Sequence, residues 1–149
     1  MKIFKTKFNR LNHVLDVVLI TGVLAAILYF TFWPSVILGG SMSPTFSPGD
    51  RIIISRIAAI SGFSRGDLVM SRIPIDGYNM NMVKRIYGIP GDFVNFGGGI
   101  LLGDGEYFIV GDNLANSIDS RHFGPINQQQ ITARVLFRYF PVNIFRQFY

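Results

Sequence analysis

The sequence predicts a mainly β, antiparallel domain that follows one N-terminal transmembrane helix. Three observations support this fold class. Residues 14–33 are almost wholly apolar, several short β-branched or aromatic runs come after them, and Gly-Asp dipeptides separate those runs. Short strands divided by turn residues are typical of antiparallel sheets rather than of helical bundles. With 149 residues, the chain has room for one domain and an anchor.

The first 33 residues predict a membrane anchor with its N-terminus in the cytoplasm. Residues 1–13 are polar and basic, and such segments stay on the cytoplasmic side. The run 14–33 has 20 residues, which as a helix matches the hydrocarbon core of about 30 Å, and Pro34 would stop it. Its length, and the lack of an Ala-x-Ala site after it, favour a retained signal anchor over a cleaved signal peptide. Residues 34–149 would then form an extracytoplasmic, β-rich domain.

Four runs in that domain are expected to be strands because β-branched and aromatic residues dominate them. They cover residues 51–54, 67–70, 107–110 and 133–139. Gly-Asp dipeptides stand at positions 49–50, 66–67, 91–92, 103–104 and 111–112. Because glycine tolerates positive φ and aspartate accepts hydrogen bonds from nearby backbone, we expect turns there.

The composition excludes several kinds of chemistry. The chain has no cysteine, so disulfides, thiol catalysis and cysteine-ligated metals are excluded. No metal-ligand cluster is apparent, and no metal or other cofactor is expected. The net charge is +5, but no basic tract of the nucleic-acid-binding type appears, so we expect no nucleic-acid partner.

A serine just beyond the anchor is the candidate nucleophile. Ser41 lies in a Gly-Gly-Ser-Met-Ser-Pro-Thr segment, and a serine hydroxyl needs an adjacent base. His13 lies on the other side of the predicted anchor, whereas His122 could form a triad with Asp119 and Ser41. Lys84 is the favoured base, because its neighbours are apolar and a dry pocket lowers a lysine pKa. A useful base needs a drop of about 3 units, or about 4 kcal/mol.

Three segments then resemble the type I signal peptidases, also called leader peptidases. They are Ser-Met-Ser-Pro-Thr at 41–45, Lys-Arg-x-x-Gly-x-Pro-Gly-Asp at 84–92, and Gly-Asp-Asn-x-x-x-Ser-x-Asp-Ser-Arg at 111–121. Their order and spacing, behind an anchor, extend the resemblance to about Pro141. It implies an antiparallel catalytic sheet of the signal-peptidase type.

The resemblance also implies roles for individual residues. Ser41 would be the nucleophile and Lys84 the general base. Ser117 would orient the lysine amine, and Asp119 and Arg121 would form a structural ion pair. The remaining expectations are supporting ones: Met42 and Pro44 shape the turn and line the pocket, and Asp112 and Asn113 supply local turn chemistry.

Two features depart from the larger members of that family. Some members have a serine two residues before the nucleophile, where this chain has Gly39, so a second oxyanion donor would have to be backbone or water. Only 18 residues separate Asp92 from Gly111, where larger relatives carry an extra β-domain. The chain therefore resembles a compact catalytic core.

The function predicted from this resemblance is cleavage of signal peptides after small residues at −1 and −3. Eight residues from Trp33 to Ser41 span at most about 28 Å, which would confine the site close to the outer surface of the inner, or cytoplasmic, membrane. The substrate would be an extended preprotein segment, and the bilayer would be the other partner. One alternative is a related peptidase dedicated to conjugative transfer or pilin maturation. A self-cleaving repressor is disfavoured by the anchor, and an inactive membrane-tethered β-domain that only binds is the remaining alternative.

Overall fold

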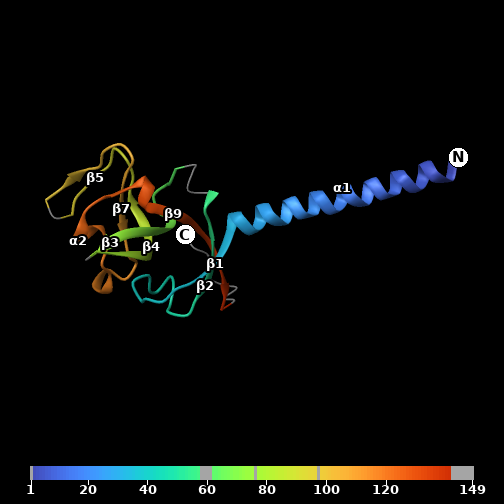
Figure 1. The fold of residues 1–149 in the computed structure, drawn as a ribbon. Helices are drawn as coiled ribbons and strands as arrows, with labels where there is room; N and C mark the ends of the chain where they lie inside the picture. Colours follow the sequence, from blue (N-terminus) through green and yellow to red (C-terminus); the bar gives the residue numbers. More distant parts are fainter. Residues whose placement is uncertain (1, 58–61, 76, 97, 142–149) are drawn as a thin grey trace. The chain divides into compact units, whose positions relative to one another are not determined.

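The computed structural model describes residues 2–57, 62–75, 77–96 and 98–141, with side chains from residue 13 onward. The chain divides into two compact units, Met1–Phe32 and Trp33–Tyr149. The first unit consists mostly of one long helix, α1 (Lys2–Thr31), drawn in blue in Figure 1. Within it, His13–Thr31 is long and apolar enough to cross a membrane.

Helix α1 ends two residues before the end of the apolar run. Phe32 and Trp33 belong instead to strand β1 (Phe32–Val36). The cause is local, because the ring of Pro34 disfavours a helical conformation at the residue before it. Aromatic side chains also favour extended backbone.

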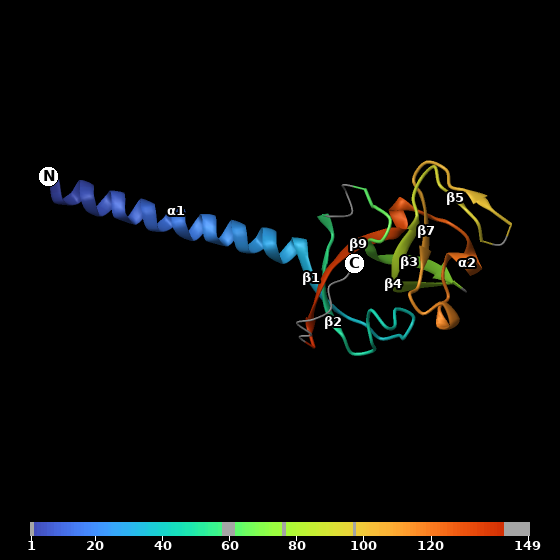
Figure 2. The same ribbon diagram turned by 180° about the vertical axis from the view of Figure 1, so that it is seen from behind.

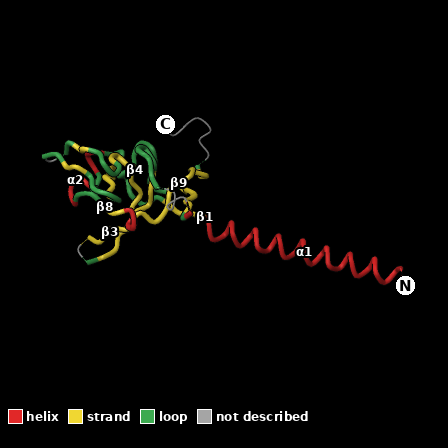
Figure 3. Tube along the Cα trace, turned by 90° about the horizontal axis from the view of Figure 1, so that it is seen from above, coloured by secondary structure: helices red, strands yellow, loops and turns green. Residues whose placement is uncertain are grey.

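The second unit is built on a seven-stranded sheet with the order β1-β2-β9-β3-β4-β7-β8. Each recorded strand pair is antiparallel, which confirms the predicted fold class. Figures 1 and 2 show the strands from two sides, and Figure 3 shows that strands and loops make up most of this unit. Its elements after β1 are β2 (Arg51–Ser55), β3 (Leu68–Ile75), β4 (Tyr78–Gly88), β5 (Phe93–Val94), β6 (Ile100–Leu101), β7 (Glu106–Val110), the 3-10 turn η2 (Leu114–Asn116), α2 (Ser120–Phe123), β8 (Ile126–Asn127), the 3-10 turn η3 (Gln128–Gln130) and β9 (Ile131–Phe140).

The four predicted strands correspond to β2, β3, β7 and β9, and three of the Gly-Asp pairs form the expected turns. Gly49, Gly66 and Gly91 have φ of +93°, +89° and +86°, a region that favours glycine. In each case the following aspartate accepts a hydrogen bond from a backbone N–H three residues earlier, at 2.8–3.0 Å.

A buried apolar cluster fixes the segment between β1 and β2. Met42 and Phe46 are only 1% and 0% exposed, and they pack with Ile52, Ile54 and neighbouring side chains of β3 and β9. Burying these two side chains stabilises the turn that carries Ser41 by about 1.5–3 kcal/mol each.

The register of the sheet determines where Lys84 lies. Val69 of β3 pairs with Lys84 of β4, and the adjacent Arg85 pairs with Val110 of β7. Gly111 follows Val110 directly, so the backbone after β7 runs beside the lysine.

Candidate active site

The candidate residues come from three separate parts of the fold. Ser41 is half-buried in the turn between β1 and β2. Lys84 lies in the middle of β4 and is 2% exposed. Ser117 and Asp119, also buried, come from the segment that links η2 to α2.

A chain of hydrogen bonds holds the amine of Lys84. Lys84 Nζ donates to Ser117 Oγ at 2.8 Å, and Ser117 Oγ donates to Asp119 Oδ2 at 2.6 Å. The backbone N–H of Gly111 donates to the same carboxylate oxygen at 2.9 Å. The lysine amine is therefore fixed in place by a buried, charge-assisted network.

Arg121 completes this network from the solvent side. Its guanidinium donates to Asp119 Oδ1 at 2.8 Å and to Oδ2 at 2.9 Å, and it also donates to the Leu114 carbonyl at 2.9 Å. Asp119 is fully buried, and its carboxylate also accepts the backbone N–H of Arg121. A buried carboxylate needs such partners, because an unpaired charge there would be strongly destabilising.

These surroundings change two pKa values. Burial disfavours the ammonium and lowers the pKa of Lys84 below its usual 10.5; Asp119 opposes this shift and Arg121 adds to it. Burial alone would raise the pKa of Asp119, but hydrogen bonds from Arg121, Gly111 and Ser117 outweigh it and hold the pKa at about 2. The site therefore favours the neutral form of the Lys84 amine and the charged form of the Asp119 carboxylate.

Gly111 brings the Ser41 loop against the lysine network. A Cβ added at Gly111 would lie 2.6 Å from the carbonyl oxygen of Ser41 and 2.7 Å from Ser117 Cβ. The backbone of Gly111 thus touches both the serine loop and the residue that holds the lysine. Among the hydrogen bonds of the described residues, none joins Ser41 Oγ directly to Lys84 Nζ.

Asn113 ties the Ser41 loop to the segment after β7. Its backbone N–H donates to the Ser41 carbonyl at 2.9 Å, and its Nδ2 donates to the Gly40 carbonyl at 3.2 Å. We expected local turn chemistry from Asn113 and Asp112; instead both make long-range contacts. The reason is that the turn after β7 lies directly against the loop.

Asp112 forms a second long-range tie. Arg85 Nε and Nη2 donate to its two carboxylate oxygens at 2.8 and 2.7 Å, and Thr45 Oγ1 also donates to it. Burial alone would raise the pKa of Asp112, but the bonds from Arg85 and Thr45 outweigh it and lower the pKa. This cluster connects all three resemblance segments. The sequence offered one signal for it: Arg85 and Asp112 each stand next to a candidate residue.

The other candidate base, His122, contacts Asp119 but not Lys84 or Ser117 in the hydrogen bonds of the described residues. His122 is more than half exposed in α2, and its Nδ1 accepts a 3.4 Å hydrogen bond from the backbone N–H of Asp119. That contact is part of a capping box at the start of α2. The Asp119 carboxylate is directed to Ser117, Gly111 and Arg121, so the structure groups Asp119 with Lys84 and gives His122 a capping position.

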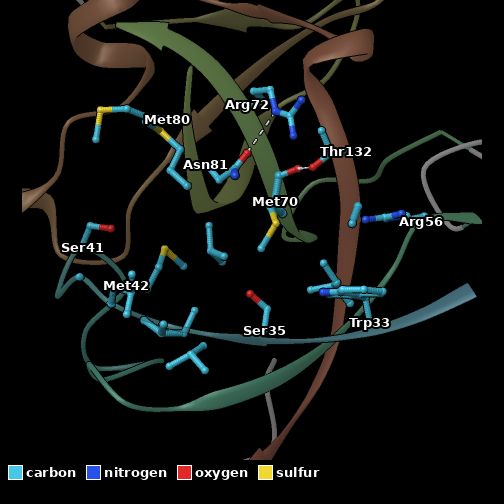
Figure 4. A pocket seen from close by; sticks show the side chains of 18 residues that line it. Trp33, Ser35, Ser41, Met42, Arg56, Met70, Arg72, Met80, Asn81 and Thr132 are labelled. Atoms are coloured by element: carbon cyan, nitrogen blue, oxygen red, sulfur yellow. Dashed lines mark hydrogen bonds between the residues drawn. The ribbon is translucent and has the colours of Figure 1, made fainter. Parts of the chain in front are cut away.

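A pocket of about 650 Å³ opens beside Ser41. Its lining near Ser41 includes Ile37, Gly39, Met42 and Val83. A Cβ added at Gly39 would meet no described atom within 4 Å. Figure 4 shows the Ser41 hydroxyl at one end, with Trp33 and Arg56 at the other. The serine hydroxyl therefore faces a space that can hold a ligand, and the lysine does not line that space.

Comparison with known proteins identifies the family of this chain. The family model described as "Signal peptidase, peptidase S26" matches residues 10–106 and 97–140. The chain therefore belongs to the signal peptidase family, peptidase S26, whose members are serine endopeptidases.

Individual relatives lead to the same conclusion. The chain is 32% identical to signal peptidase I of Bacillus amyloliquefaciens, over 99% of each protein. It is 28% identical to probable signal peptidase I-1 of Synechocystis sp., over 87% of this chain and 82% of the relative. It is 38% identical to mitochondrial ATP-independent inner membrane protease subunit 1a of Arabidopsis thaliana, over 72% of this chain and 70% of the relative. With the apolar helix His13–Thr31, this indicates a membrane-anchored signal peptidase.

Proposed function

We propose that the protein cleaves signal peptides from translocated preproteins with Ser41 as nucleophile and Lys84 as general base. The observation that carries this mechanism is the buried Lys84 amine, bonded to Ser117 at 2.8 Å beside the loop of Ser41. A lysine acts as a base only when neutral, and burial favours that form.

The proposed reaction has two steps. In the first, Ser41 Oγ attacks the scissile carbonyl carbon while its proton passes to the neutral Lys84 Nζ. The tetrahedral intermediate then collapses, the C–N bond breaks, and the lysine ammonium returns the proton to the leaving amine. In the second, a water molecule activated by Lys84 hydrolyses the ester and regenerates the serine.

Transition-state stabilisation in this scheme uses backbone donors. The Ser41 N–H is one candidate for binding the oxyanion. Gly39 carries no side chain that could donate, so the second donor is assigned to backbone or water. Ser117 acts as a positioning residue, because it fixes the amine that accepts the proton.

The substrate is proposed to bind as an added strand along β4. One edge of β4 pairs with β3 from Tyr78 to Arg85. Within the described residues, the other edge pairs with β7 at Arg85, Ile86 and Gly88. The preceding residues, Met80–Val83, line the pocket beside Ser41. An extended peptide could hydrogen-bond to this edge with alternate side chains entering the pocket. Small residues at −1 and −3 are the proposed requirement.

The proposed setting is a cell membrane with the basic N-terminal residues in the cytoplasm, an anchor that ends with α1 at Thr31, and the catalytic domain outside. Positive charge before the apolar segment supports this orientation. The short connection from Trp33 to Ser41 would keep the nucleophile within about 28 Å of the anchor.

The mechanism is tested with the full chain in neutral detergent and a preprotein that carries an Ala-x-Ala site. We expect Ser41→Ala, Lys84→Ala and Lys84→His to lower kcat at least about a thousandfold, since removing one member of such a pair disables it. His122→Gln is the control and should keep its activity. Turnover that persists in Lys84→Ala, or is lost in His122→Gln, would contradict the assignment.

A dedicated peptidase of the same family is the second candidate. The short stretch between Asp92 and Gly111 favours it. A panel of unrelated preproteins separates the two: broad cleavage supports a general enzyme, and cleavage of one preprotein supports a dedicated one.

A further inference from the structure

The end of the pocket away from Ser41 carries unpaired positive charge. Arg56, directly after β2, and Arg72, on β3, both line the pocket, and none of the described residues that line it is an aspartate or glutamate. Both arginines are exposed. Figure 4 shows them on the side of the pocket that holds Trp33 and Thr132, away from Ser41.

This charge is unusual within the domain. Five of the eight arginines between positions 51 and 138 form salt bridges with aspartates, at Arg65, Arg85, Arg121, Arg134 and Arg138. Among the described residues, neither Arg56 nor Arg72 has a carboxylate within salt-bridge distance. Of the three arginines in this range that form no such salt bridge with a described residue, Arg56 and Arg72 face the same space.

Neighbouring side chains orient both guanidinium groups without neutralising them. The Cζ of Arg56 lies 5.3 Å from the centroid of the Trp33 ring, a cation–π arrangement. Arg72 Nε donates to Asn81 Oδ1 at 3.3 Å, a bond drawn in Figure 4. Within the described part of the chain, the other N–H groups of each side chain have no partner and can bind an anionic ligand.

We propose that this end of the pocket is a subsite for an acidic side chain of the substrate, several residues before the cleaved bond. The proposal rests on the proposed function, because it takes the occupant of the pocket to be the peptide held at Ser41. Only Phe32 lies between Trp33 and the end of the apolar helix at Thr31. Trp33, at this end of the pocket, is therefore two residues along the chain from the anchor. In a signal peptide, the membrane-embedded part precedes the cleaved bond, which places residues upstream of −3 at this end.

The experiment compares pairs of Ala-x-Ala peptides that differ only by Glu or Gln at one position, scanned from −4 to −8. The full chain is assayed in neutral detergent at low salt. For exposed pairs of this kind, we expect about a three- to tenfold higher kcat/KM for the Glu peptide at one or two adjacent positions. High salt should reduce the ratio, because exposed charges are screened.

Variants assign the effect to the two arginines. The double variant Arg56→Gln/Arg72→Gln should bring the Glu-to-Gln ratio to about one. The double variant Arg56→Glu/Arg72→Glu should reverse the preference and favour a Lys peptide at the same position. Arg51→Gln is the matched control, because Arg51 is an exposed arginine over the Phe140 ring that does not line the pocket; it should keep the wild-type ratio.

Other outcomes overturn the proposal. The subsite is refuted if the Glu-to-Gln ratio of kcat/KM is about one at every position. It is also refuted if the preference for Glu persists in Arg56→Gln/Arg72→Gln. Vesicles of phosphatidylcholine alone or with phosphatidylglycerol test a lipid phosphate as occupant. If phosphatidylglycerol changes the cleavage rate only when both arginines are present, and no Glu preference is seen, the occupant of the subsite is a lipid phosphate and not a peptide side chain. Failure of the wild type to cleave any peptide would instead refute the proposed function.

Discussion

Adding one methyl group at Gly111 should force the Ser41 loop and Ser117 apart and slow catalysis. In Gly111→Ala the new Cβ would stand 2.6 Å from the Ser41 carbonyl oxygen and 2.7 Å from Ser117 Cβ. Ordinary contacts of such atoms are about 3.5 Å or longer, so the serine loop and Ser117 must separate by about 1 Å. A misplacement of that size costs about a hundredfold in rate. We therefore expect kcat to fall about a hundredfold.

Two other glycines serve as matched controls. In Gly88→Ala the new Cβ would lie 2.8 Å from side-chain atoms of Leu102 and Val94, in a different apolar cluster from the one that holds Met42 and Phe46 of the Ser41 loop. Overpacking there should cost about 1–3 kcal/mol of stability and leave kcat near the wild-type value. In Gly103→Ala the nearest atom is the flexible Glu106 carboxylate at 3.3 Å, so little change is expected.

The assay combines kcat and KM on an Ala-x-Ala peptide with a thermal unfolding curve for each variant. A folded Gly111→Ala protein with wild-type kcat would refute the close contact of the two segments. An equal loss of kcat in Gly88→Ala would show that the effect is general destabilisation.

Three further predictions concern the charged groups. Activity should rise with pH as Lys84 loses its proton, with a midpoint below 10.5 because burial lowers its pKa; a pH profile of kcat/KM with a midpoint at or above 10.5 would contradict this. The pKa of Asp119 is lowered from 3.8 to about 2, so above pH 4 its carboxylate adds about 2 kcal/mol to the free energy of unfolding. This contribution is lost as the pH falls through 2. Asp119→Asn should therefore destabilise the protein at neutral pH and flatten that acid dependence, as urea unfolding at several pH values would reveal. Arg85→Lys cannot keep both bonds to Asp112 and should lower kcat about tenfold, whereas unchanged kinetics would mean that the tie does not position the loop.

The sequence predicted the β fold and its turns because these depend on local features. The strand positions followed from β-branched and aromatic runs, and Gly49, Gly66 and Gly91 have the positive φ that their Gly-Asp pairs suggested. The helix end was misplaced because composition alone does not show that the backbone before Pro34 is already extended.

The contacts between segments could not be predicted in the same way. Strand β4 was not among the predicted strands, because its exposed first half mixes asparagine, methionine and tyrosine without a clear alternation. The tie from Asn113 to Gly40 joins residues 73 positions apart, and the tie from Arg85 to Asp112 joins residues 27 apart. Such pairs depend on the register of β4 with β7, which no local pattern specifies. The family resemblance grouped the three segments that lie together in the fold. The hydrogen bonds between their residues are known only from the structure.

The dependence of the Ser41 loop on residues 111–113 has a consequence for the timing of biosynthesis. A chain grows from its N-terminus, so the serine and the lysine are both synthesised before the segment that joins them. Under the proposed mechanism, the nascent protein could not cut a peptide bond until that last third had folded back onto the loop. The proposed anchor would then enter the bilayer before the site that could cleave it was assembled.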